Sequence, residues 1–155
     1  MDGSSLAGMY VLESWHRSDG TEPFGSRPSG YLTYGRDGRV SVQIGASDRL
    51  PIGLPVGRLM EARAMLRRPW KLAFNPEVIG ALKRFIRNAS SFTAYSGTYE
   101  IDGSTVVHHI DLASIPDWEG TDLIRGLERT ETGLRLTTPE GDALVWQAAD
   151  LRPGE

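Results

Sequence analysis

Short segments in which apolar and polar residues alternate, separated by glycine and proline, run through most of this chain. The 155 residues include 18 glycines and 9 prolines. Alternation with a period of two is typical of a strand with one buried face. It predicts eight strands, at residues 7–16, 30–35, 39–45, 91–101, 104–113, 122–130, 133–138 and 143–149. A chain of this length is expected to form one domain, residues 1–155, around one core.

Tight turns between these segments favour hairpin connections. Asp37-Gly38 and Asp102-Gly103 are typical of two-residue turns that need positive φ angles, and Pro139-Glu140-Gly141-Asp142 marks a third turn. Eight strands joined mostly by hairpins predict an all-β fold, a single eight-stranded antiparallel up-and-down barrel, because closure leaves no edge unpaired.

One stretch, between Ala46 and Ala89, has helical periodicity and forms an insertion between the third and fourth strands. A first helical piece ends at Pro69. A second helix is predicted over residues 76–88, with Asn75 as its N-cap. Its apolar face is expected to pack on the barrel, either as a plug at one end or as a lid over a pocket mouth; its members are Val78, Ile79, Leu82, Phe85 and Ile86.

Composition narrows the function classes. The formal net charge is −3, from 17 basic and 20 acidic residues scattered along the chain, so no basic stripe predicts a nucleic-acid partner. The absence of cysteine excludes disulfides, thiolate metal sites and a cysteine nucleophile. The start of the chain does not look like a signal peptide, and no apolar run reaches a membrane span. We therefore expect a cytoplasmic protein without a membrane partner; its oligomeric state is left open, a homodimer included.

Several stretches together resemble the lipocalin-like domain family of small bacterial and fungal proteins. They cover nearly the whole chain apart from the helical insertion: Leu6–Leu12, Pro23-Phe24-Gly25, Gly30–Tyr34, Asp37-Gly38-Arg39, Tyr95–Glu100, Val106–His109, Trp118–Thr121 and Leu144-Val145-Trp146. The resemblance implies a barrel around a cavity and does not fix a reaction.

Two positions depart from the pattern of lipocalin-type barrels. Tyr10 stands where such barrels usually open with Gly-x-Trp, and Gln147-Ala148 follow Trp146 where an arginine is usual. In that family the Trp and the Arg stack to close one end of the barrel. Here we expect Tyr10 and Trp146 to be buried where the first and last strands meet.

The register of the predicted hairpin at Asp102-Gly103 decides which side chains point inward. A two-residue turn there places Gly97 opposite His108, with Tyr95 and Tyr99 on the same, more apolar face. His108 is then expected to point inward and His109 outward. Gly97 would leave an empty position across from His108, with room for the imidazole or for a ligand.

These residues form the candidate site. His108, Tyr95 and Arg125 are the candidate catalytic residues, because a histidine suits proton transfer and an inward arginine needs an anionic partner. The candidate ligand-binding residues are Tyr99, Gly97, Ser14, Trp146 and Phe85. Two alternatives stay open: His108 as a core group bonded to a tyrosine hydroxyl, and Arg125 in an ion pair with Glu13.

No cofactor or metal is expected, because adjacent strand residues His108 and His109 point to opposite faces and His16 is the only other histidine. The leading hypothesis is a small-molecule pocket protein. It would be a cofactor-free cyclase, isomerase or dehydratase acting on an apolar, polyketide-like metabolite of secondary metabolism. The alternatives are a non-catalytic carrier for a small hydrophobic ligand and an interaction module with a filled interior.

Overall fold

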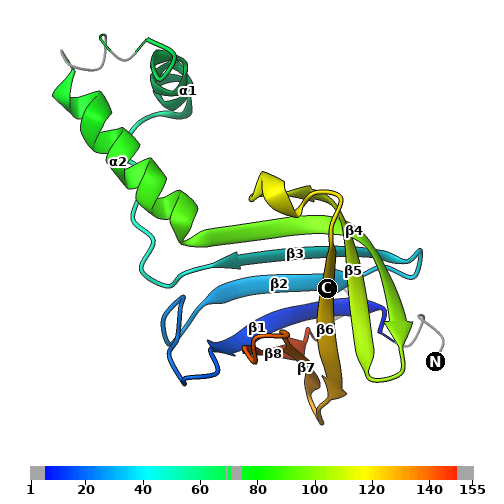
Figure 1. Cartoon of the computed structure of the whole chain (residues 1–155). Helices are drawn as coiled ribbons and strands as arrows, with labels where there is room; N and C mark the ends of the chain where they lie inside the picture. The colour runs from blue at the N-terminus through cyan, green and yellow to red at the C-terminus, as the bar shows by residue number, and fades with distance from the viewer. Residues whose placement is uncertain (1–5, 69, 71–74, 150–155) are drawn as a thin grey trace, which may run out of the picture. The chain divides into compact units, whose positions relative to one another are not determined.

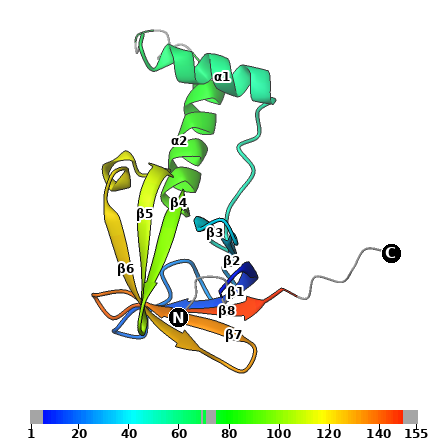
Figure 2. The same cartoon turned by 90° about the vertical axis from the view of Figure 1, so that its right-hand side faces the viewer.

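The computed structural model describes residues 6–68, 70 and 75–149. It consists of two compact units. One is a β-barrel, made by the chain up to Ser47 and from Phe92 onward. The other is the helical unit, Asp48–Ser91, inserted between two neighbouring strands of the barrel. Figures 1 and 2 show the strands of the barrel and the two helices of the inserted unit.

The barrel is a closed antiparallel sheet whose eight strands follow one another in chain order. The last strand pairs with the first, so the prediction of an eight-stranded up-and-down barrel with a helical insertion is confirmed. Its strands are β1 (Gly8–His16), β2 (Ser29–Tyr34), β3 (Arg39–Gly45), β4 (Phe92–Asp102), β5 (Thr105–Ala113), β6 (Asp122–Arg129), β7 (Gly133–Thr137) and β8 (Ala143–Ala148), with a short 3-10 helix, η3 (Pro116–Trp118), between β5 and β6.

The interior of the barrel is formed by the apolar member of each alternating pair. In β3, Val40, Val42 and Ile44 are buried while Gln43 is exposed. At the junction of β1 and β8, Leu12 lies opposite Trp146, and Tyr10 lies opposite Ala148. Tyr10 and Trp146 are both buried, as predicted. The Tyr10 hydroxyl donates a hydrogen bond to the carbonyl of Leu6 at 2.9 Å, which satisfies the one polar atom of its side chain.

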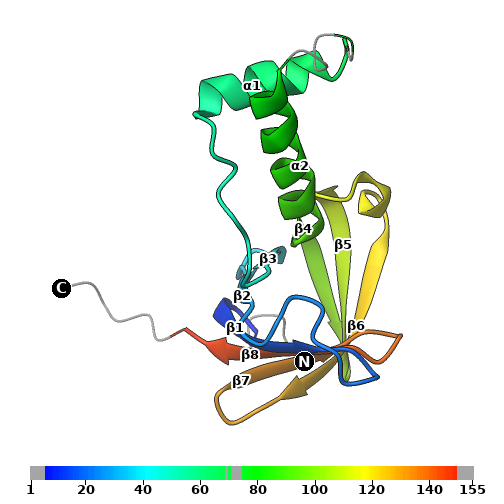
Figure 3. The ribbon, with the colours of Figure 1, turned by 90° about the vertical axis from the view of Figure 1, so that its left-hand side faces the viewer.

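The helical unit consists of α1 (Val56–Met65) and α2 (Pro76–Ser90). Figure 3 shows α1 crossing the first turns of α2. The predicted N-cap is confirmed, because the Asn75 side chain accepts a hydrogen bond from the backbone N–H of Val78 at 3.3 Å. Within the predicted apolar face, Val78 and Leu82 are buried against α1.

The predicted packing of that face on the barrel is wrong for Val78 and Leu82, which are buried against α1. The cluster that buries Val78 and Leu82 contains Ala62, with Met65 packed against it, so the partner of the face is another helix. Ile86 is exposed. The roles of the unit as plug or lid stay predictions.

Charge divides sharply between the two units. Residues 48–91 hold nine basic and three acidic side chains, a net charge of +6, whereas the rest of the chain holds eight basic and seventeen acidic side chains, a net charge of −9. The total of −3 therefore hides an uneven distribution, in which the basic residues are concentrated in residues 48–91.

The turn between β4 and β5 lies one residue later than predicted. Asp102 pairs with Thr105, so the turn residues are Gly103 and Ser104, and Gly103 has a φ of 59°. Asp102 does not adopt a positive φ. Glycine at the first central position is the arrangement of a type II′ turn, which a Gly-Ser pair suits better than Asp-Gly.

The later turn changes every cross-strand pair between β4 and β5, but each side chain stays on the predicted face of the sheet. Tyr99, and not Gly97, lies opposite His108, while Gly97 lies opposite Ile110. The predicted empty position beside His108 is therefore wrong. Because the pairing shifts by two residues, an even number, His108 still points into the barrel and His109 still points out.

Gly97 is required for a different reason. A β-bulge interrupts the β4–β5 pairing between Ser96 and Gly97, and a Cβ atom at Gly97 would collide with the backbone carbonyl of His109. The position thus serves close approach of two backbones.

We expect Gly97→Ala to lower the free energy of unfolding by about 1–3 kcal/mol, because the added methyl group forces the backbones of β4 and β5 apart. The matched control is Gly126→Ala, also within a strand, where the nearest atom to a new Cβ is that of Thr137 at 3.5 Å, an ordinary contact. Urea denaturation of both variants measures the difference. Wild-type stability of Gly97→Ala would contradict the bulge geometry.

Candidate functional site

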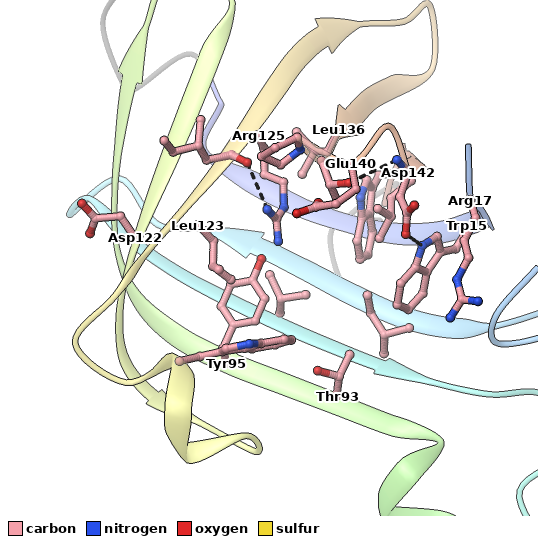
Figure 4. A pocket seen from close by; sticks show the side chains of 18 residues that line it. Trp15, Arg17, Thr93, Tyr95, Asp122, Leu123, Arg125, Leu136, Glu140 and Asp142 are labelled. Atoms are coloured by element: carbon pink, nitrogen blue, oxygen red, sulfur yellow. Dashed lines mark hydrogen bonds between the residues drawn. The ribbon is translucent and has the colours of Figure 1, made fainter. Parts of the chain in front are cut away.

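The barrel contains a partly open cavity of about 660 Å³, a size typical of small-molecule sites. Figure 4 shows its side chains, which come from β1, β3, β4, β6, β7, β8 and the loops next to them. The apolar lining residues include Val42, Ile44, Leu123, Leu136, Leu144, Trp15, Trp118 and Trp146. The polar lining residues are Arg17, Thr93, Tyr95, Asp122, Arg125, Thr138, Glu140 and Asp142. The site is therefore a largely apolar cavity with a smaller number of polar side chains in its lining.

His108 lies behind the cavity wall. Its side chain is 0% exposed and is not part of the lining. Nε2 lies 2.8 Å from the Tyr34 hydroxyl and Nδ1 lies 2.9 Å from the Tyr95 hydroxyl. A neutral imidazole has one donor and one acceptor nitrogen, so one tyrosine donates to His108 and the other accepts from it. The arrangement matches the alternative in which His108 is a satisfied core group.

Burial keeps the three hydrogen-bonded side chains, Tyr34, His108 and Tyr95, uncharged. It lowers the pKa of His108 to about 3, with further lowering by the positive charges of Arg125 and His109. It raises the pKa of Tyr95 to about 12, against the opposing charge and hydrogen bond of Arg125. It also raises the pKa of Tyr34 well above its usual value. At neutral pH the imidazole is therefore neutral and both hydroxyls keep their protons.

Tyr95 connects these hydrogen-bonded side chains to the cavity, where it lies beside Arg125 in the lining. Figure 4 shows the Tyr95 ring rising from β4 and the Arg125 guanidinium reaching toward its hydroxyl from β6. Arg125 also donates a hydrogen bond to the carbonyl of Ile124 at 3.0 Å. Among the residues that the structure describes, no ion pair joins Arg125 to Glu13 or to any other carboxylate within 4.0 Å. The hydrogen bonds of its guanidinium thus go to uncharged oxygen atoms.

Two buried polar atoms on the cavity wall have no partner. They are the indole N–H of Trp146, in a side chain that is 1% exposed, and the hydroxyl of Thr93, in a residue that is 9% exposed. Buried polar atoms are nearly always hydrogen-bonded, so two without a partner among the described residues are unusual.

A bulge in β1 explains why the prediction of Ser14 as a lining residue is wrong and why Trp15 takes that place. Leu12 pairs with Trp146, but Ser14 pairs with Val145, so Glu13 is the extra residue. Beyond it the alternation is reversed, and Trp15 lines the cavity in place of Ser14. The Trp15 indole donates a hydrogen bond to the Asp142 carboxylate at 3.2 Å. No sequence pattern marks Glu13 as a bulge.

The other candidates divide between the cavity and the core. Trp146, Tyr95 and Arg125 line the cavity, as does Trp118, whose ring lies edge-on to Tyr95 with centroids 6.1 Å apart. Tyr99 is buried in the core, where its hydroxyl donates to the carbonyl of Gly35 at 3.0 Å. Phe85 belongs to the helical unit, where the Arg63 guanidinium lies 6.0 Å from its ring centroid. Neither Tyr99, Gly97 nor Phe85 is part of the lining.

The outer face of β5 carries His109, whose ring contacts two carboxylates. Nδ1 lies 2.6 Å from Asp122 and Nε2 lies 3.8 Å from Glu100. The hydrogen bond to Asp122 and the nearby negative charges raise the pKa of this exposed imidazole. In the described part of the chain, no three metal-ligating side chains gather into a group that suits a metal ion.

Fold and cavity together define a class: a small up-and-down β-barrel whose interior is built to enclose a small, largely apolar molecule. A family model described as "Lipocalin-like domain" matches residues 7–152, and the chain belongs to that family. This confirms the resemblance, and the fold suggests binding of a small hydrophobic ligand.

A solved structure supports the fold. The chain is similar to a lipocalin-like protein from Bacteroides uniformis, with 14% identity and a TM-score of 0.51, over 93% of this chain and 98% of the other. At this identity the similarity shows the fold alone. A search of curated proteins gives no significant match. Neither described helix, α1 nor α2, is long and apolar enough to cross a membrane; the cytoplasmic location stays a prediction.

We expect the buried His108 to make the protein sensitive to acid. Its pKa is about 3 in the folded protein and near 6.5 in an unfolded chain, so the unfolded chain takes up a proton first. The stability that neutral His108 contributes is therefore fully present above about pH 6.5 and falls as pH is lowered toward 3, by up to about 1.4 kcal/mol per pH unit.

Urea unfolding between pH 7.5 and 4 measures this slope. His108→Gln should lower stability at neutral pH and flatten the slope, whereas His16→Gln, at an exposed histidine, should keep the wild-type slope. The same slope in His108→Gln and wild type would contradict the assignment.

Proposed function

We propose that the barrel binds one small, largely apolar molecule inside its cavity. The observation that carries this is the unfilled volume of about 660 Å³ enclosed by the strands, in a barrel size whose interior is otherwise filled by side chains. Three tryptophans line it, Trp15, Trp118 and Trp146. Large rigid aromatic surfaces gain contact area with little loss of conformational entropy, which suits binding of a flat apolar body.

A neutral probe tests this proposal. N-phenyl-1-naphthylamine, an uncharged apolar dye, is expected to bind with one site per chain and to quench tryptophan fluorescence. Leu123→Trp, which fills part of the cavity, should weaken binding at least tenfold. Val11→Trp, at an exposed position of β1, should bind as wild type does. Wild-type affinity in Leu123→Trp, or no binding by the wild-type protein, would contradict the proposal.

A second candidate function, cofactor-free isomerisation, cyclisation or dehydration of a polyketide-like metabolite, is favoured by one specific observation. The hydrogen-bonded chain from Tyr34 through His108 ends at the Tyr95 hydroxyl, on the cavity and beside the Arg125 cation. If Tyr34 donates to Nε2 and Nδ1 donates to Tyr95, the Tyr95 proton is free to point at a carbonyl oxygen of a ligand. Arg125 would stabilise the negative charge that develops on that oxygen during enolisation, while a carboxylate of the lining such as Glu140 would accept the C–H proton.

In this candidate, Tyr95 and Arg125 contact the substrate, and His108 is a positioning residue. Direct proton abstraction by His108 is disfavoured, because both ring nitrogens are occupied and burial lowers its pKa to about 3. The carrier function requires the same cavity without proton transfer.

Exchange of the acidic C–H protons of benzoylacetone for solvent deuterium, followed by NMR, separates the two functions. An enzyme should accelerate exchange, and Tyr95→Phe should lower the accelerated rate by about 100-fold, because it removes the proton donor. Tyr31→Phe, at an exposed tyrosine of β2, is the control and should keep the wild-type rate. No acceleration by the wild-type protein would leave the carrier function.

A further inference from the structure

Two polar atoms of side chains in the cavity lining have no hydrogen-bond partner among the described residues: the Trp146 indole N–H, which can only donate, and the Thr93 hydroxyl, which can donate or accept. Arg125 is a permanent cation with only donors, and the Tyr95 hydroxyl beside it keeps its proton. A ligand that hydrogen-bonds to Arg125 must therefore bring an acceptor atom.

The acidic side chains of the lining already have partners. Asp142 accepts from the Trp15 indole, and Asp122 contacts the imidazole of His109 on the outer face. The exposed Glu140 forms hydrogen bonds with its own backbone and with Thr138, and these bonds, together with the positive charge of Arg125, lower its pKa. The hydrogen bonds of Arg125, by contrast, go to the neutral oxygens of Ile124 and Tyr95. Among the described residues, no carboxylate lies within 4.0 Å of the Arg125 guanidinium, so a ligand can supply a direct anionic partner.

A half-buried guanidinium needs a negative partner more than an exposed one does, because less water screens its charge. Guanidinium groups bind carboxylates with two parallel hydrogen bonds, and charge-assisted bonds of this kind are about twice as strong as neutral ones. The side chains Tyr95 and Arg125 lie close together on the wall (Figure 4). The pair thus offers adjacent donors to one acidic group.

From these contacts we infer that the ligand is an organic acid: an apolar, preferably aromatic body that carries a carboxylate or an enolate held by Arg125 and Tyr95. The apolar body lies among the tryptophans and leucines of the lining. This inference rests on the proposed function, since it names the class of ligand for the same cavity.

The test uses three probes with one apolar body and different heads: 2-naphthoate, 2-naphthylmethanol and 2-naphthylmethylammonium. Calorimetric titration of the full chain should give 2-naphthoate at least tenfold tighter binding than the alcohol, and the ammonium the weakest binding. Arg125→Met, which keeps the length of the side chain without its charge, should remove the advantage of the carboxylate over the alcohol. Arg39→Met, at an exposed arginine of β3, should keep that advantage.

A second variant covers the case in which Arg125→Met fails to fold. Tyr95→Phe has nearly the same shape and removes only a hydroxyl, and it should lower the affinity for 2-naphthoate by several-fold. Equal affinity for the three heads, or an unchanged carboxylate preference in folded Arg125→Met, would overturn the inference. If either of these results is found while N-phenyl-1-naphthylamine still binds, the inference is wrong and the proposed function is retained. If the wild-type protein binds none of the probes, the inference and the proposed function are both wrong.

Discussion

Closure of the sheet between β1 and β8 is the constraint on which the rest of this structure depends. Pairing of Tyr10 with Ala148 and of Leu12 with Trp146 gives the strands at both ends of the chain their hydrogen-bonding partners. An open sheet of eight strands would expose two edges and one apolar face. Once closed, the barrel turns that face into an interior, and where its side chains do not meet, the interior becomes a cavity. The site is therefore a consequence of the closure.

Two β-bulges decide what the cavity contains. The bulge at Glu13 exchanges Ser14 for the larger Trp15 on the cavity wall, and the bulge beside Gly97 lets β4 and β5 approach closely. Between them, the barrel interior divides into a filled part around Tyr99 and His108 and an open part around Trp15 and Trp146. Each bulge adds one residue to its strand, and the residues beyond it then face the opposite side of the sheet.

The sequence predicts the barrel well because alternation, glycine and proline act locally. All eight strands, the N-cap at Asn75 and the inward direction of His108 follow from such patterns. The site is predicted less well, since it depends on non-local geometry. The sequence predicts Ser14 as a lining residue, whereas Trp15 lines the cavity, because a bulge leaves no mark in the sequence. It predicts Gly97 opposite His108 because Asp-Gly favours a type I′ turn, whereas the chain forms a type II′ turn at Gly103-Ser104. Whether an inward side chain fills the core, as Tyr99 does, or borders a void is set by its neighbours across the barrel.

The opposite charges of the two units affect how the molecule meets its surroundings. The total of −3 describes neither the barrel, at −9, nor residues 48–91, at +6. Local charge, and not the total, governs attraction to polyanions and to charged surfaces, and salt weakens it. Loose adsorption to nucleic acid, heparin or cation-exchange resin at low ionic strength is thus an expected property of the inserted segment. Such adsorption would report on residues 48–91, and not on the cavity of the barrel unit, whose net charge is −9.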